Sequence, residues 1–291
     1  MMGGVAEIGG NKVLVEDGDT RILLDFGMSY SDRRRFYSEP LLSPRDEKEL
    51  LEFGMLPKLR GLYRFEESGP SIDAVFLSHS HGDHSGCIPF LNRDIPVYCG
   101  ETTATIIRAL YETRTKSMEA DISGLRFNTF RTGSKIGIGS IEVEPVHVDH
   151  SVPAAYGFLV HTSEGTLVYT GDLRAHGTRS DMTNDFVERA QALRPDAVLP
   201  EGTNLIGATL TTEAEVQSKI SSIVQASSRI VLADFSNVDV DRFRTFYNVA
   251  RESGRVLAVS LRQAYVLSKL AAEGRIKIPD VAHDENIVVY Q

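Results

Sequence analysis

The chain has 291 residues, of which 42% are hydrophobic and 24% charged, and its formal net charge is −9. This composition is typical of a globular protein with a proper core, and no apolar run approaches the ~20 residues of a membrane helix. The first ten residues lack the basic and apolar regions of a signal peptide, and two cysteines cannot form a disulfide framework. We therefore expect a cytoplasmic protein with no membrane partner, whose net charge argues mildly against nucleic acid.

The first 200 residues predict mainly β-strands joined by glycine-rich turns. The first two strands flank Asp17-Gly18-Asp19 and predict a hairpin. One later run, IDAVFLS, is continuously apolar, as expected for a strand buried on both faces. Apolar or alternating runs that predict strands lie at 11–17, 20–27, 72–78, 141–146, 157–162 and 166–172.

The pattern changes after about residue 205. Thr212 and Glu215 have the spacing of a capping box, and a helical apolar stripe follows at Val216, Ile220, Ile223 and Val224. Alternating strands and helices predict a parallel sheet covered by helices. The predicted order is a buried strand at 229–235, a helix at 239–253, a strand at 255–260, a helix at 261–274 and a strand-like run at 287–291. We therefore predict two domains, 1–205 and 206–291, and expect the second to be incomplete.

A short segment, FLSHSHGDHSGC, carries an unusual density of metal-binding side chains. In extended backbone, His79 and His81 point the same way and can grip one ion. Gly82 permits a sharp turn, which redirects Asp83 and His84 toward a second position. Such a mixture of imidazole and carboxylate favours zinc, with manganese or iron as alternatives.

Two later segments supply candidates for the remaining ligands. His147 and His150 lie where an alternating strand ends, and His150 is the better candidate because it lies in a Ser–Pro turn. Asp172 follows a buried strand, and a carboxylate there can bridge two ions, unlike neutral imidazole. A pair of metals would hold a hydroxide and clamp the oxygens of a phosphodiester or acyl transition state.

The order H-x-H-x-D-H, then a lone histidine, then T-G-D resembles the metallo-β-lactamase fold. The resemblance implies an α/β protein, a four-layer αββα sandwich with a dinuclear site at one edge. It implies that a water activated between the two metals is the nucleophile. By position, the first metal would be held by His79, His81 and His150, the second by Asp83 and His84, with Asp172 bridging them.

The resemblance narrows to the β-CASP branch, whose members include ribonuclease J. It rests on GGVAEIGGN, SHSHGDHSGCIPFL, DHSVPAAYGF, YTGDLRAHG and PEGTN. In that branch a parallel α/β domain follows the acidic motif, in which Glu201 would support a ligand histidine through a hydrogen bond. Two later histidine motifs of the branch have no match between 206 and 291, and His283 lacks their glycine-rich context. We therefore expect the chain to be cut short before them.

Several weaker signals have competing interpretations. Residues 30–37, YSDRRRFY, predict either a solvated loop or an RNA-binding patch. Arg174 is a candidate for a phosphate contact. His176 lines the pocket or lies in an exposed loop, and Cys87 is expected to pack as a small apolar residue.

The sequence as a whole predicts a metal-dependent phosphodiesterase acting on single-stranded RNA, as an exonuclease, an endonuclease or both. Two Zn²⁺ ions are favoured over Mn²⁺, Asp83 and Asp172 are the catalytic carboxylates, and Asp83 doubles as a proton acceptor. One alternative is a small-molecule metallohydrolase of the lactonase or thioesterase type. Another is a non-catalytic RNA-processing subunit. A homo-oligomer is compatible with the sequence.

Overall fold

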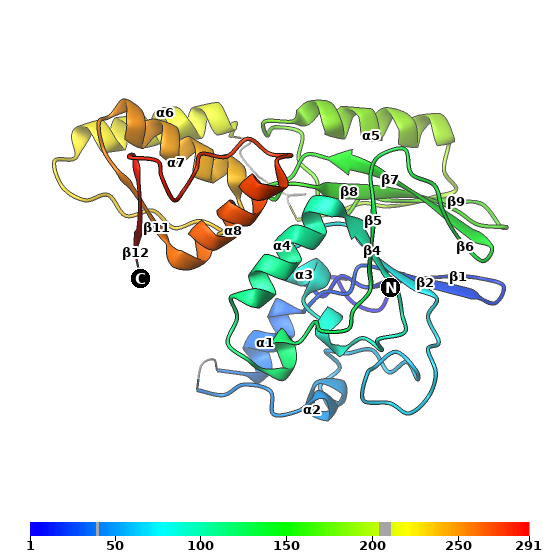
Figure 1. Ribbon diagram of the computed structural model, residues 1–291. Helices are drawn as coiled ribbons and strands as arrows, with labels where there is room; N and C mark the ends of the chain where they lie inside the picture. Colours follow the sequence, from blue (N-terminus) through cyan, green and yellow to red (C-terminus); the bar gives the residue numbers. More distant parts are fainter. Residues whose placement is uncertain (39–40, 204–210, 291) are drawn as a thin grey trace.

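The computed structural model of the protein describes residues 1–38, 41–203 and 211–290. Within these residues, the strands form two five-stranded sheets and one two-stranded sheet. Figure 1 shows the two large sheets lying face to face, with helices outside each of them and the last three helices grouped to one side. The predicted α/β class and the αββα sandwich are therefore confirmed.

The first sheet has the strand order β1-β2-β3-β4-β5. The antiparallel pair β1 and β2 turns between Asp17 and Thr20, as the hairpin prediction required. The remaining neighbours are parallel. The strands are β1 (Val13–Asp17), β2 (Thr20–Leu24), β3 (Ala74–Leu77), β4 (Val97–Gly100) and β5 (Phe127–Phe130).

The second sheet has the order β10-β9-β8-β7-β6 and is antiparallel except for the pair β9 and β10. Residues 163–165, which separate the predicted strands 157–162 and 166–172, lie in the turn that joins β8 to β9. The strands are β6 (Ile136–Ile138), β7 (Ile141–Val148), β8 (Ala155–His161), β9 (Thr166–Tyr169) and β10 (Ala197–Leu199).

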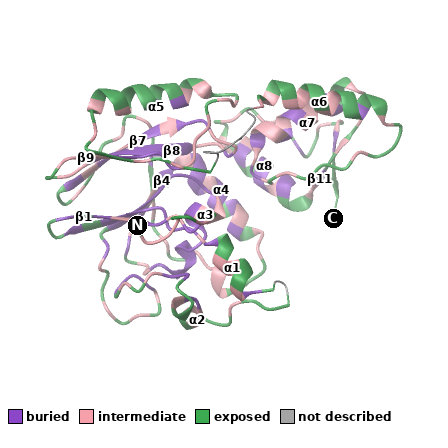
Figure 2. Ribbon diagram, turned by 180° about the vertical axis from the view of Figure 1, so that it is seen from behind, coloured by how far each residue is buried: buried purple, intermediate pink, exposed green. Residues whose placement is uncertain are grey.

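One hydrophobic core lies between the two sheets, where Ile22 and Phe76 meet Tyr156 and Phe158. Burial of such aliphatic and aromatic surface is the dominant stabilising term in folding. Figure 2 shows these strands mostly buried, whereas much of the outer surface of α5 (Ser180–Leu193) is exposed. Gly157 leaves room for α5, since an added Cβ would lie 2.4 Å from the ring of Phe186.

The outer face of the first sheet is covered by α4 (Glu101–Glu112), whose Ala104 and Ile107 pack on Val75 and Val97. Neither α4 nor α5 was expected from the sequence. Shorter helices surround the same core. They are α1 (Tyr30–Phe36), α2 (Glu47–Glu52), α3 (Gly82–Ser85) and the 3₁₀ helices η1 (Ile88–Phe90) and η2 (Met118–Ala120).

The C-terminal segment has the predicted alternation of helices and parallel strands. Both hydrogen bonds of the capping box between Thr212 and Glu215 are present, and β11 pairs with β12 in parallel. The elements are α6 (Glu213–Ala226), α7 (Val240–Glu252), β11 (Leu257–Ser260), α8 (Leu261–Glu273) and β12 (Ile287–Tyr290). One face of α8 packs on α4, where Val266 and Leu270 meet Ile106.

Two predicted elements are wrong. Residues 229–235 form no strand, and Ile230 and Leu232 are 82% and 86% exposed. A strand needs a partner for its backbone hydrogen bonds, and none of the residues that the structure describes pairs with this run. The loop predicted at 30–37 contains α1 instead, because the Ser29 hydroxyl accepts a hydrogen bond from the backbone of Asp32 and caps the helix.

The predicted domain boundary at residue 205 lies outside the described residues, so the division into 1–205 and 206–291 stays a prediction. Among the helices that the structure describes, none is long and apolar enough to cross a bilayer.

Candidate metal centre

The predicted metal ligands lie where three strands end. His79 and His81 directly follow β3, and the chain then turns into α3, which carries Asp83 and His84. His150 follows β7, and Asp172 follows β9. The strands of the two sheets thus bring segments that are far apart in the sequence to one edge of the sandwich.

The first group of donor atoms comprises three imidazole nitrogens and one carboxylate oxygen, all within 4.8 Å of one another. His81 Nδ1 lies 3.0 Å from His79 Nε2 and 3.1 Å from His150 Nε2. Asp172 Oδ2 lies 3.9 Å from His79 Nε2 and 3.7 Å from His150 Nε2. Tetrahedral zinc with ligands at ~2.0–2.1 Å requires donors about 3.3 Å apart. The observed spacing therefore fits a zinc-sized cation.

The second group of donors lies on the other side of Asp172. His84 Nε2 is 3.1 Å from Asp172 Oδ1 and 3.7 Å from Asp83 Oδ2. His79, Asp83 and His84 also each offer an atom within 4.8 Å of the others. The two oxygens of Asp172 therefore face different groups, which is the arrangement that a bridging carboxylate requires.

The imidazoles of the first group are held neutral. Burial, followed by the charges of neighbouring histidines, lowers the pKa of His79 well below its usual value. Burial and His81 lower the pKa of His150 to about 3, and burial also lowers the pKa of His81. A neutral imidazole is the form that binds a metal. Each of these rings can therefore present an unprotonated nitrogen to a cation.

His84 is oriented by a buried aspartate. Its Nδ1 lies 2.7 Å from Asp25 Oδ2, and Asp25 also accepts hydrogen bonds from the backbone N–H and hydroxyl of Ser78 and from the hydroxyl of Tyr169. Burial lowers the pKa of His84, but the charge of Asp25 and hydrogen bonds to Asp172 and Asp25 outweigh it and raise the pKa well above its usual value. With Nδ1–H donating to Asp25, Nε2 is directed at the second group.

Glu201 was expected to hydrogen-bond a ligand histidine, but the carboxylate that does so for His84 is Asp25. The carboxylate of Glu201 accepts a hydrogen bond from the backbone N–H of Thr203 and contacts no histidine in the described part of the chain. Asp25 was missed because it belongs to the apolar run 20–27. The one sequence signal was a carboxylate at the end of a buried strand, the same signal that identified Asp172.

The backbone around Asp83 is clamped by the segment that follows β2. Phe26 and Met28 donate backbone hydrogen bonds to the carbonyls of His84 and Gly82. Between them, Gly27 packs so closely that an added Cβ would lie 1.6 Å from the Asp83 carbonyl oxygen. Asn11 donates to the same carbonyl through its backbone and its side chain. The position of Asp83 is therefore fixed by main-chain contacts.

The weaker candidates lie outside both donor groups. Arg174 is held by Asp149 at 3.1 Å and by Asp241 at 2.5 Å, so its charge is already paired. His176 is half-buried and belongs to neither group. His147 hydrogen-bonds the Thr132 hydroxyl and packs on the ring of Tyr156, away from the metal ligands as predicted. Cys87 is buried in the core, also as predicted.

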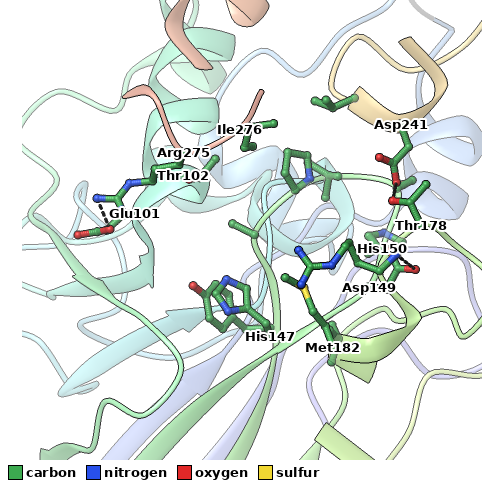
Figure 3. Close-up of a pocket in the computed structure, with 18 of the residues that line it drawn as sticks. Glu101, Thr102, His147, Asp149, His150, Thr178, Met182, Asp241, Arg275 and Ile276 are labelled. Carbon is green, nitrogen blue, oxygen red and sulfur yellow. Dashed lines mark hydrogen bonds and ion pairs between the residues drawn. The ribbon is translucent and has the colours of Figure 1, made fainter. Parts of the chain in front are cut away.

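A pocket of about 540 Å³ opens beside His150. Figure 3 shows His147 and Met182 lying near each other, with Glu101 and Arg275 on one side and Thr178 and Asp241 on the other. Carboxylates of Glu101, Asp149 and Asp241 also line it. The basic residues that line the pocket outnumber these carboxylates. They are Arg131, Arg179, Arg244, Arg275 and Lys277.

Comparison with known proteins places these features in a family. Residues 20–205 match the family model described as a β-lactamase superfamily domain. The chain is 27% identical over 288 residues to ribonuclease J 1 of Streptococcus pyogenes, covering 96% of this chain and 47% of that protein. It is 28% identical over 264 residues to ribonuclease J of Mycobacterium tuberculosis, covering 87% and 42%. The chain thus spans about half the length of these curated relatives.

A solved structure supports the same fold. A protein of unknown function from Enterococcus faecalis superposes with a TM-score of 0.75 at 23% identity, covering 99% of this chain and 72% of that one. The sequence resemblance to the metallo-β-lactamase fold and to ribonuclease J is therefore confirmed.

Proposed function

The chain belongs to the β-lactamase superfamily, and from this premise we propose that it is a metal-dependent phosphodiesterase that hydrolyses single-stranded RNA. The observation that carries the proposal is the pair of donor groups on either side of Asp172. A pair of cations held there would supply an activated water and would stabilise negative charge on the phosphate oxygens.

The donor atoms favour two Zn²⁺ ions. Three neutral imidazoles and one carboxylate oxygen form a nitrogen-rich first site that suits zinc. The second group has one imidazole and two carboxylates, a mixture that also accepts Mn²⁺. The residues present therefore fit a dinuclear site.

The carboxylates have distinct proposed roles. Asp172 fixes the spacing of the two groups through its two oxygens. Asp83 is the proton acceptor for the attacking water, since its side chain is 20% exposed whereas the imidazole of His84 beside it is buried. Asp25 acts through His84, whose ring it orients. Backbone contacts to residues 82–84 hold these groups still, which is what positioning of a water for in-line attack requires.

Three observations support RNA as the substrate. The relatives that the chain matches over most of its length are named ribonuclease J. Five basic side chains line the pocket beside His150, against three acidic ones. Arg131 and Arg275 pair with Glu101, and Arg244 pairs with Asp241, so it is the excess of two positive charges that suits a polyanion despite the net charge of −9. The α/β segment after residue 211 contributes Asp241, Arg244 and Lys277 to that pocket and so forms one wall of it.

A small-molecule metallohydrolase is the second candidate. The pocket beside His150 has a volume of about 540 Å³, within the range of ordinary small-molecule sites. A lactone or thioester would be cleaved by the same ligand set. With RNA as the substrate, the protein would act in the cytoplasm, as expected from its sequence.

The test is cleavage of end-labelled single-stranded RNA by the metal-loaded protein. We expect cleavage that is abolished in Asp83→Ala and retained in Asp185→Ala, a matched change at an exposed aspartate of α5. The ladder of fragments would show whether the protein attacks the RNA from one end or cleaves it internally. If the protein carries two metals and leaves RNA intact while hydrolysing a lactone or thioester, the ribonuclease proposal is wrong.

A further inference from the structure

A second hollow, of about 430 Å³, lies on the Asp83 side of the metal centre, whereas the pocket in Figure 3 lies on the His150 side. Tyr30, Arg33 and Arg34 of α1 form one wall, and Arg114 and Glu119 form the other. The arginines of α1 belong to the segment YSDRRRFY, for which the sequence left an RNA-binding role open. None of these residues belongs to the metal centre.

The charges of this hollow are only partly compensated. Arg33 forms a two-pronged ion pair with Glu119, which neutralises both. Arg34 forms no ion pair with any residue that the structure describes. Within the same described ranges, Arg114 contacts the backbone carbonyl of Glu119 and the ring of Tyr111 but no carboxylate. Two guanidinium groups therefore face the hollow with their charges uncompensated.

A third guanidinium belongs to the same cluster. Arg262, in the first turn of α8, is exposed and has no carboxylate partner among the described residues. The helix α8 runs antiparallel to α4, with Tyr265 donating a hydrogen bond to Glu112 at one end and Thr102 donating to Glu273 at the other, so the first turn of α8 lies beside the end of α4 that leads into Arg114. Like charges gathered in this way repel unless an anion lies between them. Guanidiniums from α1, from the segment after α4 and from the first turn of α8 are thus gathered where an anionic ligand would compensate their charges.

Tyr30 connects the cluster to the metal centre. Its hydroxyl would lie 2.7 Å from a Cβ added to Gly82, the residue that precedes Asp83. Tyr30 also lines the hollow. The residue is 38% exposed. An aromatic face is therefore available between the free arginines and the candidate catalytic carboxylate.

We propose that Tyr30, Arg34, Arg114 and Arg262 form an RNA groove that holds the backbone of the single-stranded substrate on the Asp83 side of the metal centre. The arginines contact phosphates, and Tyr30 stacks on a base. A cationic track combined with aromatic platforms is the usual way to bind single strands without reading their sequence. This inference rests on the proposed ribonuclease function and adds a second contact surface to it, opposite the pocket beside His150.

The test compares charge reversals on one helix. Arg34→Glu removes a free charge from the RNA groove, and Arg35→Glu is the matched control, because Arg35 lies over Phe36 outside the hollow. Arg262→Glu tests the end of the groove that α8 contributes. All three are made in Asp83→Ala protein, so that a fluorescent single-stranded RNA stays intact while its anisotropy reports binding. Thermal unfolding of each variant checks that the fold is retained.

We expect Arg34→Glu and Arg262→Glu each to weaken RNA binding roughly fivefold or more. Each should also lower the slope of log affinity against log salt by about 0.7 for every phosphate that the variant no longer neutralises. Arg35→Glu should change neither property. Equal weakening in all three variants, or no weakening in any while the parent binds, would overturn the groove and leave the ribonuclease proposal standing. A parent that neither binds RNA nor, with Asp83 restored, cleaves it would overturn both.

Discussion

Asp25 Oδ2 accepts a hydrogen bond from Nδ1 of His84 at 2.7 Å, and both side chains are buried. The two residues are 59 positions apart and meet because β2 and β3 are parallel neighbours whose ends lie together. This contact leaves Nε2 of His84 as the only nitrogen of that ring that can face the second donor group. We therefore expect metal binding at the second donor group to depend on Asp25, which acts by orienting His84.

We predict that Asp25→Asn weakens metal binding at the second group by about 10- to 100-fold. Asp25 accepts four hydrogen bonds, so an amide at this position turns an NH₂ toward at least one donor. Competition with a zinc chelator measures the affinity. Tyr169→Phe is the control, since it removes one donor to Asp25 and leaves the contact to His84; unchanged zinc affinity in Asp25→Asn would contradict this role.

A second prediction separates two histidines of one segment. His150→Ala should cost the protein close to one metal ion, because His150 Nε2 faces His81 Nδ1 and Asp172 Oδ2. His147→Ala should leave the metal content unchanged, since its ring contacts Thr132 and Tyr156. Elemental analysis of the purified variants measures both. Equal metal loss in the two variants would mean that the donor group is assigned wrongly.

The sequence predicted the local part of the metal centre well. His79 and His81 point the same way because alternate residues of an extended chain do so, and the structure has their ring nitrogens 3.0 Å apart. His150 and Asp172 were singled out as polar residues at strand ends, but their assignment to particular metals came from the resemblance, since no local rule states which distant strand ends meet. Asp25 was not predicted as a partner of His84, because that contact also joins two distant strand ends.

The failures concern elements that depend on distant partners. Residues 229–235 have the composition of a buried strand, yet composition does not supply a neighbour, and Ile230 and Leu232 are exposed. Segment 30–37 was interpreted from its charges, although Ser29 carried the local signal of a helix cap. Arg174 stays an untested candidate for a phosphate contact, and no local pattern could indicate its two carboxylate partners, which lie 25 and 67 residues away.

A third prediction concerns pH. Burial, followed by the charge of Arg179, lowers the pKa of His147 to about 4, against ~6.5 in the unfolded chain. The unfolded state therefore binds more protons between about pH 4 and 6.5, so the free energy of unfolding falls as the pH falls through that window. From pH 7 to pH 5 this one group should cost about 2 kcal/mol.

His147→Gln removes this titration. Chemical unfolding at pH 7 and pH 5 should show a smaller loss of stability in the variant than in the parent, by about the same 2 kcal/mol. His176→Gln is the control, since His176 lies outside the pocket and the metal groups. Parallel pH profiles for the parent and His147→Gln would show that His147 is not held neutral.

The last prediction concerns the main-chain clamp on Asp83. A methyl group at residue 27 would lie 1.6 Å from the Asp83 carbonyl oxygen and 2.7 Å from the backbone nitrogen of His84. Backbone cannot rotate away as a side chain can, so Gly27→Ala must displace residues 82–84 or the strand end that precedes it. We expect a loss of more than about 2 kcal/mol in stability, together with weaker binding of zinc at the second group. Gly137→Ala, where an added Cβ meets nothing within 4 Å, should change neither property. Unchanged stability and unchanged zinc affinity in Gly27→Ala would contradict this prediction. They would mean that the loop carrying Asp83 and His84 can move, and that the clamp does not fix the position of these two ligands.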